Sequence, residues 1–166
     1  MTGEAPIALV FMGVAGCGKS SVGQAVADVL HLPLIEGDTF HPEANREKMR
    51  AGIALTDADR AGWLEELGRQ LAAKPDGVLL ACSALKRAYR DVLRRHRPDV
   101  RFVFLDLDRD AALERVSTRP GHFFSPTLID SQFATLERPD GEPGVLTVSA
   151  LAPLDRLVTE IRDWLA

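Results

Sequence analysis

Eight consecutive residues near the start of the chain fit the pattern GxxxxGK[ST] of a phosphate-binding loop. They read Gly13, Val14, Ala15, Gly16, Cys17, Gly18, Lys19 and Ser20. In such a loop the glycines let backbone amides turn toward phosphate oxygens, the lysine reaches the β- and γ-phosphates, and the hydroxyl ligates magnesium. The run therefore predicts a site for a nucleoside triphosphate, with Lys19 as a catalytic group and Ser20 as a metal ligand.

The residues on either side of this loop fit the context that it requires, a strand before it and a helix after it. Residues Ile7–Met12 are all apolar, as in a parallel strand that is buried on both faces. From Ser20 to Leu30 apolar residues recur at helical spacing. The alternative is a glycine-rich turn that matches the pattern by chance, and the two flanking elements argue against it.

A second group of candidate residues lies in the polar stretch Gly37–Asn45. Asp38 could orient an acceptor hydroxyl, accept its proton or hold magnesium, directly or through a bound water. Alternatively, Asp38 caps a helix that begins near Pro42 or Glu43. His41 could hydrogen-bond a polyhydroxylated or anionic substrate, or it could serve only as a turn residue.

The apolar run Val78–Cys82 ends without the aspartate that switch GTPases and motor ATPases place there to hold magnesium. This absence favours a kinase for a small molecule, in which Ser20 and Asp38 share the metal.

Basic residues follow the same run. We expect Lys86 and Arg87, which are closest to the strand end, to meet an anionic substrate. The later arginines should be solvated: Arg90, Arg94, Arg95 and Arg97. Nucleic acid is disfavoured as a partner, because the cluster lacks interleaved aromatic residues beyond Tyr89 and the protein is acidic overall.

Arg60 stands in the first turn of a helical pattern for which Thr56 or Asp57 is the expected N-cap. A cation is unfavourable at that end of the helix dipole, so a carboxylate or phosphate partner is a reasonable expectation. The alternative is an exposed ion pair with Asp57 or Asp59.

Arg115 and Arg119 are four residues apart in a helical pattern, so their guanidinium groups point the same way. The following stretch 119–126 contains glycine and proline and suits a lid that closes over phosphates and excludes water. Arginines at its base can stabilise charge on a transferring phosphoryl group. Alternatively, Arg115 pairs with Asp108 or Glu114 on a solvated helix face.

The pattern of the whole chain indicates one α/β domain over its 166 residues. Five apolar runs predict a five-stranded parallel sheet: Ile7–Met12, Leu32–Glu36, Val78–Cys82, Phe102–Leu105 and Val145–Val148. Helical patterns lie between them, most clearly at Asp57–Lys74 and at Pro153–Leu165, where Pro153 fits the first turn.

The net charge of −4 argues against a general nucleic-acid or membrane-surface role. No apolar stretch reaches the roughly 18 residues that span a bilayer, and the N-terminus lacks a signal-type segment, so we expect a cytoplasmic protein. Cys17 and Cys82 should both be reduced thiols.

Several separated stretches together resemble the gluconokinase family, small ATP-dependent kinases related to shikimate and nucleoside monophosphate kinases. They read MGVAGCGKS, GDTFHPEANREKM, GIALTDADRAGWL, CSALKRAYRD and RPGHFFSPTLIDSQFATLE. The resemblance implies a three-layer P-loop kinase fold, a mobile lid, ATP, Mg²⁺ and frequent homodimers. It also implies phosphorylation of D-gluconate at its C6 hydroxyl, giving 6-phospho-D-gluconate and ADP.

Position by position, residues 13–20 resemble the ATP loop, Asp38 the carboxylate near magnesium and the acceptor, and Arg115 and Arg119 the lid-side arginines. The resemblance suggests an anion-contacting set of His41, Lys48, Arg60, Lys86, Arg87 and His122.

Two alternatives stay open at this point. One is a P-loop kinase for another small acceptor, such as shikimate or another aldonate, and the other is a nucleotide-binding module without turnover. The chain departs from the family pattern at Cys17, where serine is frequent, at Ala54, where proline is expected, and at Arg46, where an apolar residue is usual.

Overall fold

The computed structural model describes residues 6–118 and 126–166, and five parallel strands form its central sheet. The strands are β1 (Ala8–Met12), β2 (Leu34–Glu36), β3 (Val78–Ala81), β4 (Arg101–Asp106) and β5 (Val145–Ser149). Their order is β2-β3-β1-β4-β5, and every neighbouring pair is parallel. β1 is buried along its whole length at the centre, as its apolar run predicts.

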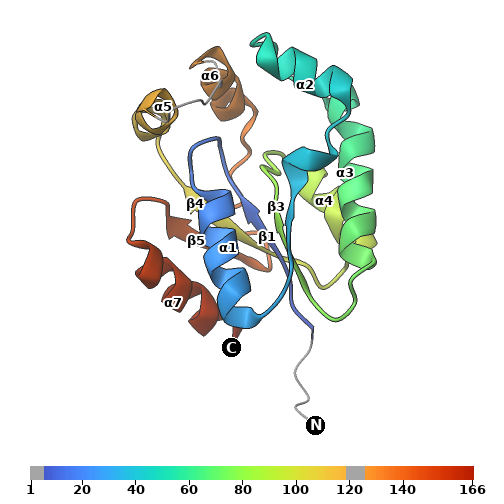
Figure 1. The fold of residues 1–166 in the computed structure, drawn as a ribbon, viewed down its shortest axis with the longest axis vertical. Coiled ribbons are helices and arrows are strands. Elements are labelled where there is room, and N and C mark those ends of the chain that lie inside the picture. Colours follow the sequence, from blue (N-terminus) through green and yellow to red (C-terminus); the bar gives the residue numbers. More distant parts are fainter. Residues whose placement is uncertain (1–5, 119–125) are drawn as a thin grey trace.

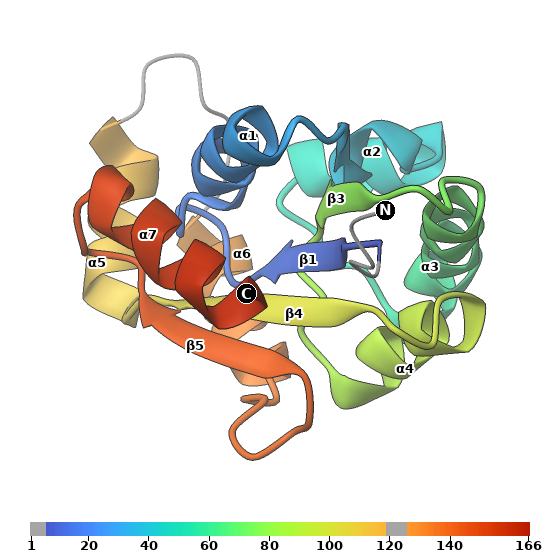
Figure 2. The ribbon, with the colours of Figure 1, turned by 90° about the horizontal axis from the view of Figure 1, so that it is seen from below.

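Parallel strands require crossover connections, and helices supply them on both faces of the sheet. They are α1 (Lys19–Leu30), the 3₁₀ turn η1 (Gly37–Phe40), α2 (Glu43–Arg50), α3 (Asp57–Ala72), α4 (Arg87–His96), α5 (Arg109–Thr118), α6 (Pro126–Thr135) and α7 (Leu154–Leu165). Figure 2 shows α1 and α7 on one face, with α3 and α4 together on the other. The three-layer α/β fold expected from the sequence is confirmed. None of the helices within these described residues is both long and apolar enough to cross a membrane.

The phosphate loop connects the carboxyl end of β1 to the start of α1. Figure 1 shows it at one end of the sheet, with α2 on one side and α5 and α6 on the other. Active sites of open α/β sheets form at the carboxyl ends of the strands. This end of the molecule is therefore where the predicted residues can meet.

The ends of two helices show how well local patterns predict boundaries. Thr56 caps α3, since its hydroxyl accepts a hydrogen bond from the Asp59 amide and the Asp59 carboxylate accepts one from the Thr56 amide. Pro153 is the N-cap of α7 rather than a residue of its first turn, because its backbone is extended and the helix begins at Leu154.

The basic cluster on α4 differs from the sequence prediction. We expected its later arginines to be solvated, which is wrong for Arg90, Arg94 and Arg97. Arg90 is fully buried, and Arg97 is 8% exposed and donates to the carbonyls of Leu71 and Lys74. The remaining arginine of that set, Arg95, is exposed as predicted.

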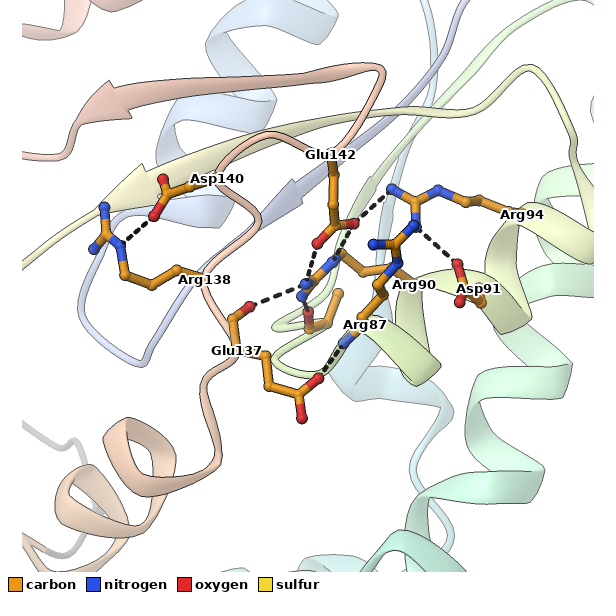
Figure 3. A network of polar contacts seen from close by, with 9 residues as sticks. Arg87, Arg90, Asp91, Arg94, Glu137, Arg138, Asp140 and Glu142 are labelled. Carbon is orange, nitrogen blue, oxygen red and sulfur yellow. Dashed lines mark hydrogen bonds and ion pairs between the residues drawn. The ribbon is translucent and has the colours of Figure 1, made fainter.

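The buried guanidinium of Arg90 has hydrogen-bond partners just before α4 and in the segment that follows α6. Its guanidinium donates twice to the Glu142 carboxylate, at 3.1 and 2.6 Å, and also to the carbonyls of Ala84 and Glu137. Arg94 donates to the same Glu142 carboxylate at 2.9 Å (Figure 3). Arg90, Arg94 and Glu142 therefore form an internal ion-pair network.

Candidate active site

A cavity of about 260 Å³ lies at the carboxyl ends of the strands. The phosphate loop and the start of α1 form one side, through Gly16, Gly18, Lys19 and Ser20. The rest of the lining includes Asp38 of η1, His41 directly after it, and Arg60 and Trp63 of α3. The structure thus brings the predicted nucleotide loop and part of the predicted acceptor set to one cavity.

The shape of the phosphate loop depends on its glycines. Gly13 has a φ of 144°, and a Cβ there would come within 2.8 Å of Cys17 Sγ and 2.9 Å of the Leu105 carbonyl. Gly18, with a φ of 94°, is the N-cap of α1. The first amides of α1 have no partner within the helix and face the cavity side of the loop, which makes this end suited to phosphate.

The cysteine within the loop is a buried free thiol, and so is Cys82 at the end of β3, as predicted. Burial raises the pKa of the Cys82 thiol to about 12, which keeps it protonated and inert at neutral pH. Cys17 packs beneath Gly13, so its role in the structure is to support the loop.

Lys19 lies folded over the loop that precedes it. Its ammonium group donates to the carbonyls of Gly13 and Val14, both at 3.2 Å. These contacts hold the charge at the mouth of the loop, within the lining of the cavity. From there a lysine can pair with a nucleotide phosphate.

Ser20 has a carboxylate partner that sequence analysis missed. Its hydroxyl donates to Glu36 Oε2 at 2.8 Å, and Asp38 lies two residues further along the chain. The missed signal is the position of Glu36, an acidic residue at the carboxyl end of a strand.

The oxygen donors at this point of the cavity fit Mg²⁺. This ion typically takes one or two carboxylates together with phosphate oxygens and waters, not a cage built by the protein alone. Residues 6–118 and 126–166 contain no group of three or more His, Cys, Asp or Glu side chains suited to a metal.

Asp38 owes its position to the turn η1. A Cβ on Gly37 would come within 2.6 Å of the Ala81 carbonyl, and the Trp63 indole donates to the Gly37 carbonyl at 2.8 Å. The Asp38 side chain is 89% exposed. The alternative that Asp38 caps α2 is wrong, because the N-cap is Pro42 and no side chain caps that helix.

His41 is buried against Trp63, with ring centroids 4.0 Å apart and an angle of 17° between the rings. The Asn45 amide group donates to Nδ1 at 3.2 Å, which places the proton of a neutral imidazole on Nε2. Burial lowers the pKa of His41 below its usual value, and nearby Arg60 and Arg46 add to this while Asp38 opposes it. His41 can therefore present a neutral N–H, with Nε2 at 3.9 Å from Asp38 Oδ1.

Arg60 reaches the cavity from the first turn of α3. Its Nη1 donates to the Leu55 carbonyl at 2.9 Å and to the Tyr89 hydroxyl at 3.0 Å. The expected alternative, an ion pair with Asp57 or Asp59, does not describe it. Among the described residues its Nε and Nη2 have no hydrogen-bond partner, so these donors can serve a carboxylate of a ligand.

The carboxylates beside Arg60 are taken by the two predicted lysines. Lys48 pairs with Asp59 at 2.7 Å and lowers the pKa of that carboxyl to about 2. Lys86 donates to both oxygens of Asp57, at 3.0 and 3.1 Å. Neither lysine lines the cavity, and both tie neighbouring elements to the start of α3. Their direct contact with substrate stays a prediction.

Arg87 also lies outside the cavity lining, with an exposed side chain. Its backbone amide donates to Glu137 Oε1 at 2.9 Å. A contact of its side chain with an anionic substrate stays a prediction.

Arg115 braces the phosphate loop from α5. It donates to the Gly16 carbonyl at 2.9 Å and to the Ala150 carbonyl at 3.0 Å. These bonds place Arg115 against the phosphate loop, and its action on a transferring phosphoryl group stays a prediction. Arg119, His122 and the predicted lid over 119–126 lie outside the described residues, apart from Pro126 at the start of α6.

Sequence analysis also missed Gln132 on α6. Its Oε1 accepts a hydrogen bond from the Ala15 amide at 2.6 Å, although the two residues are 117 positions apart. No local pattern announces such a contact, because a glutamine on a helix is usually solvated.

Comparison with known proteins extends the likeness over almost the whole chain. The shikimate kinase family model matches residues 15–137. A probable gluconokinase of Schizosaccharomyces pombe is 43% identical over 150 residues, covering 84% of this chain and 78% of that protein. The thermosensitive gluconokinase of Escherichia coli K12 is 43% identical over 145 residues, covering 86% and 76%. A crystal structure of a gluconokinase from Sinorhizobium meliloti 1021 gives a TM-score of 0.90 at 45% identity, covering 98% and 93%.

Proposed function

This chain belongs to the gluconokinase family of P-loop kinases, and on that premise we propose that it transfers the γ-phosphoryl group of ATP to the C6 hydroxyl of D-gluconate. The products are 6-phospho-D-gluconate and ADP. The observation that carries this proposal is the shared cavity, with the phosphate loop on one side and Asp38, His41 and Arg60 on the other. A simple nucleotide binder has no need of the second side.

The phosphate side of the reaction belongs to the loop and α1. Backbone amides from Gly16 onward and the N-terminus of α1 hold the phosphates, and Lys19 leaves its carbonyl partners to pair with the β- and γ-phosphates. Ser20 and Glu36, with Asp38 directly or through water, would hold Mg²⁺, which neutralises charge developing on those phosphates. Arg115 keeps the loop in place through the Gly16 carbonyl.

The acceptor side belongs to Asp38, His41 and Arg60. The exposed Asp38 carboxylate orients the C6 hydroxyl and accepts its proton as the oxygen bonds to phosphorus. The neutral His41 donates to a hydroxyl of the sugar acid through Nε2. The guanidinium of Arg60 pairs with the gluconate carboxylate through nitrogens that have no partner among the described residues.

Residues outside this core retain their predicted roles as part of the proposal. Arg119, together with Arg115, stabilises charge on the transferring phosphoryl group. The residues that contact the anionic acceptor also include His122, Lys48, Lys86 and Arg87. For both lysines the ion pairs with α3 support an indirect role, in which they position Arg60.

An assay of ADP release with Mg²⁺ and ATP tests this function. The acceptors are gluconate, other aldonates, shikimate and nucleoside monophosphates. We expect release that depends on gluconate, and NMR of the product should place the phosphate on C6. Transfer to shikimate but not to gluconate, or no release with any acceptor, would contradict the proposal.

A homodimer and a cytoplasmic location also belong to the proposal, and the family resemblance is their support. Light scattering of the purified chain, at the concentration used in the assay, tests the dimer. A mass of one chain would contradict it.

A further inference from the structure

Gln132 of α6 lines the cavity, and its side chain is hydrogen-bonded to the phosphate loop. Its Oε1 accepts from the Ala15 amide at 2.6 Å, and Gln132 lines the cavity together with Leu128 and Ser131 of the same helix. Figure 1 shows α6 on the side of the loop away from α2. This contact gives α6 a direct connection to the site.

The other half of the same carboxamide has two hydrogens to donate. Within residues 6–118 and 126–166, Nε2 of Gln132 has no hydrogen-bond partner. A carboxamide that is fixed through its oxygen has the orientation of its nitrogen fixed as well, since the group is planar. Gln132 therefore offers a preset donor at the edge of a cavity that also holds Asp38 and Arg60.

We propose that Gln132 is a substrate-binding residue, whose Oε1 holds the Ala15 amide while its Nε2 donates to a hydroxyl of the acceptor. This inference rests on the proposed function, because it takes the acceptor to be a polyhydroxylated acid. Asp38 supplies an acceptor and Arg60 supplies cationic donors from other elements of the same lining. Gln132 adds a neutral donor, which suits a sugar hydroxyl.

The position of Ala15 favours the acceptor over the nucleotide as the ligand of Nε2. The amides that open α1 follow Gly18, and they form the part of the loop suited to phosphate. Ala15 precedes them, and its own amide is already bonded to the carboxamide.

The segment directly after α6 is anchored at Glu137, two residues beyond the end of the helix that carries Gln132. The Glu137 amide donates to the Leu85 carbonyl at 2.8 Å, and the Glu137 carbonyl accepts from Arg90 at 2.9 Å. Its carboxylate accepts from the Arg87 amide, at the start of α4 (Figure 3). A group held on an anchored helix can define the position of a substrate more closely than one on a loop.

Two variants separate the halves of the carboxamide. Gln132→Met removes both, whereas Gln132→Glu keeps an oxygen for the Ala15 amide and replaces the donor with an anion. We expect Gln132→Met to raise the KM for gluconate on the order of tenfold, and Gln132→Glu at least as much, with the KM for ATP within about twofold. Gln24→Met, a change at an exposed glutamine of α1 whose side chain donates to Asp28, is the matched control and should match wild type.

The possible results distinguish a failure of the inference about Gln132 from a failure of the proposed function. Wild-type activity in Gln132→Glu would overturn the inference, since Gln132 would then only brace the loop. A gluconate KM within twofold in both variants, or a rise in the ATP KM alone, would also overturn it while the proposed function stands. No turnover of gluconate by the wild type would overturn the proposed function and the acceptor named here.

A spectroscopic readout tests the loop contact without any turnover. The ¹⁵N–¹H resonance of Ala15 should move in Gln132→Met and less in Gln132→Glu, with the Gln24→Met spectrum unchanged there. An unmoved Ala15 resonance in Gln132→Met would contradict the hydrogen bond on which the inference depends.

Discussion

Two charged regions of this molecule contain the same residue types and use them differently. In the network of Arg90, Arg94 and Glu142, the Arg90 side chain is fully buried and the Glu142 side chain is 5% exposed. In the cavity, the Asp38 side chain is 89% exposed, and Arg60 uses only Nη1 for hydrogen bonds within the described residues. A charged side chain whose donors or acceptors are all bonded within the protein stabilises the fold. A charged side chain with unused donors or acceptors can bind a ligand.

The energies of the two regions differ for the same reason. Burial alone would raise the pKa of Glu142, but hydrogen bonds from Arg90 and Arg94 bring it below its usual value. Removing one partner of such a pair leaves a buried charge without compensation. An exposed carboxylate such as Asp38 stays hydrated, so changing it should leave the stability nearly unaltered.

Among the charged residues of the two regions, the largest effect on turnover is expected at Lys19. Lys19→Ala removes the ammonium group that pairs with the transferring phosphate, so kcat should fall on the order of 10³-fold or more. The unfolding midpoint should change little, because within the described part of the chain the lysine bonds only to carbonyls and a thiol of its own loop. Steady-state kinetics and thermal unfolding check both parts, and near-normal turnover would refute the role of Lys19.

In the network of Arg90, Arg94 and Glu142, a substitution should lower the stability of the fold. Arg90→Ala leaves Glu142 buried with one partner fewer, and the free energy of unfolding should fall by about 3–5 kcal/mol. Arg95→Ala, at an exposed arginine of the same helix, is the matched control and should change it by less than about 0.5 kcal/mol.

Urea denaturation measures both arginine variants. If Arg90→Ala does not fold, Glu142→Gln, which keeps the volume and some hydrogen bonds, should fold with a smaller loss. Equal stabilities of Arg90→Ala and Arg95→Ala would contradict the claim that the buried ion-pair network stabilises the fold.

A moderate effect is expected at Arg60. Its unused donors should pair with the substrate carboxylate, and hydrogen bonds to charged groups contribute about 1.5–3 kcal/mol. Arg60→Ala should therefore raise the gluconate KM about 10- to 100-fold with a smaller change in the ATP KM. Arg69→Ala, at an exposed arginine of α3, should leave both constants unaltered, and an unchanged gluconate KM in Arg60→Ala would remove that residue from the site.

The smallest effect is a pH dependence of stability from His41. Burial lowers its pKa in the folded state below the ordinary value of 6.5, so the unfolded chain binds the proton more tightly. The stability due to this residue is complete above pH 6.5 and declines as the pH falls from 6.5 toward the lowered value. Unfolding midpoints between pH 8 and 5 should show a shallower decline in His41→Gln, and identical slopes would contradict a buried neutral imidazole.

Local sequence patterns were enough to predict the sheet, the phosphate loop and the cap of α3. The apolar run of β1 and the glycines of the loop act on immediate neighbours, and so do Thr56 and Asp59. Asp38 and His41 could be named as candidates because they follow a strand end in an α/β pattern.

Contacts between distant residues could not be predicted. Arg90 meets Glu142 across 52 positions, and Gln132 meets Ala15 across 117. A buried ion pair and a solvated arginine look alike in a sequence, since the side chain that compensates the charge comes from another element. The same reason explains why Lys48 and Lys86 face carboxylates of α3 instead of lining the cavity.

The most direct test of this division between structural and chemical charges is the turnover of Asp38→Asn with gluconate at saturating ATP. We expect kcat to fall about 10²- to 10⁴-fold, since the amide cannot accept the proton of the C6 hydroxyl. Nucleotide affinity should fall far less than kcat, and the unfolding midpoint should stay at the wild-type value. A kcat within twofold of wild type would contradict the claim that the exposed carboxylate of η1 serves the reaction.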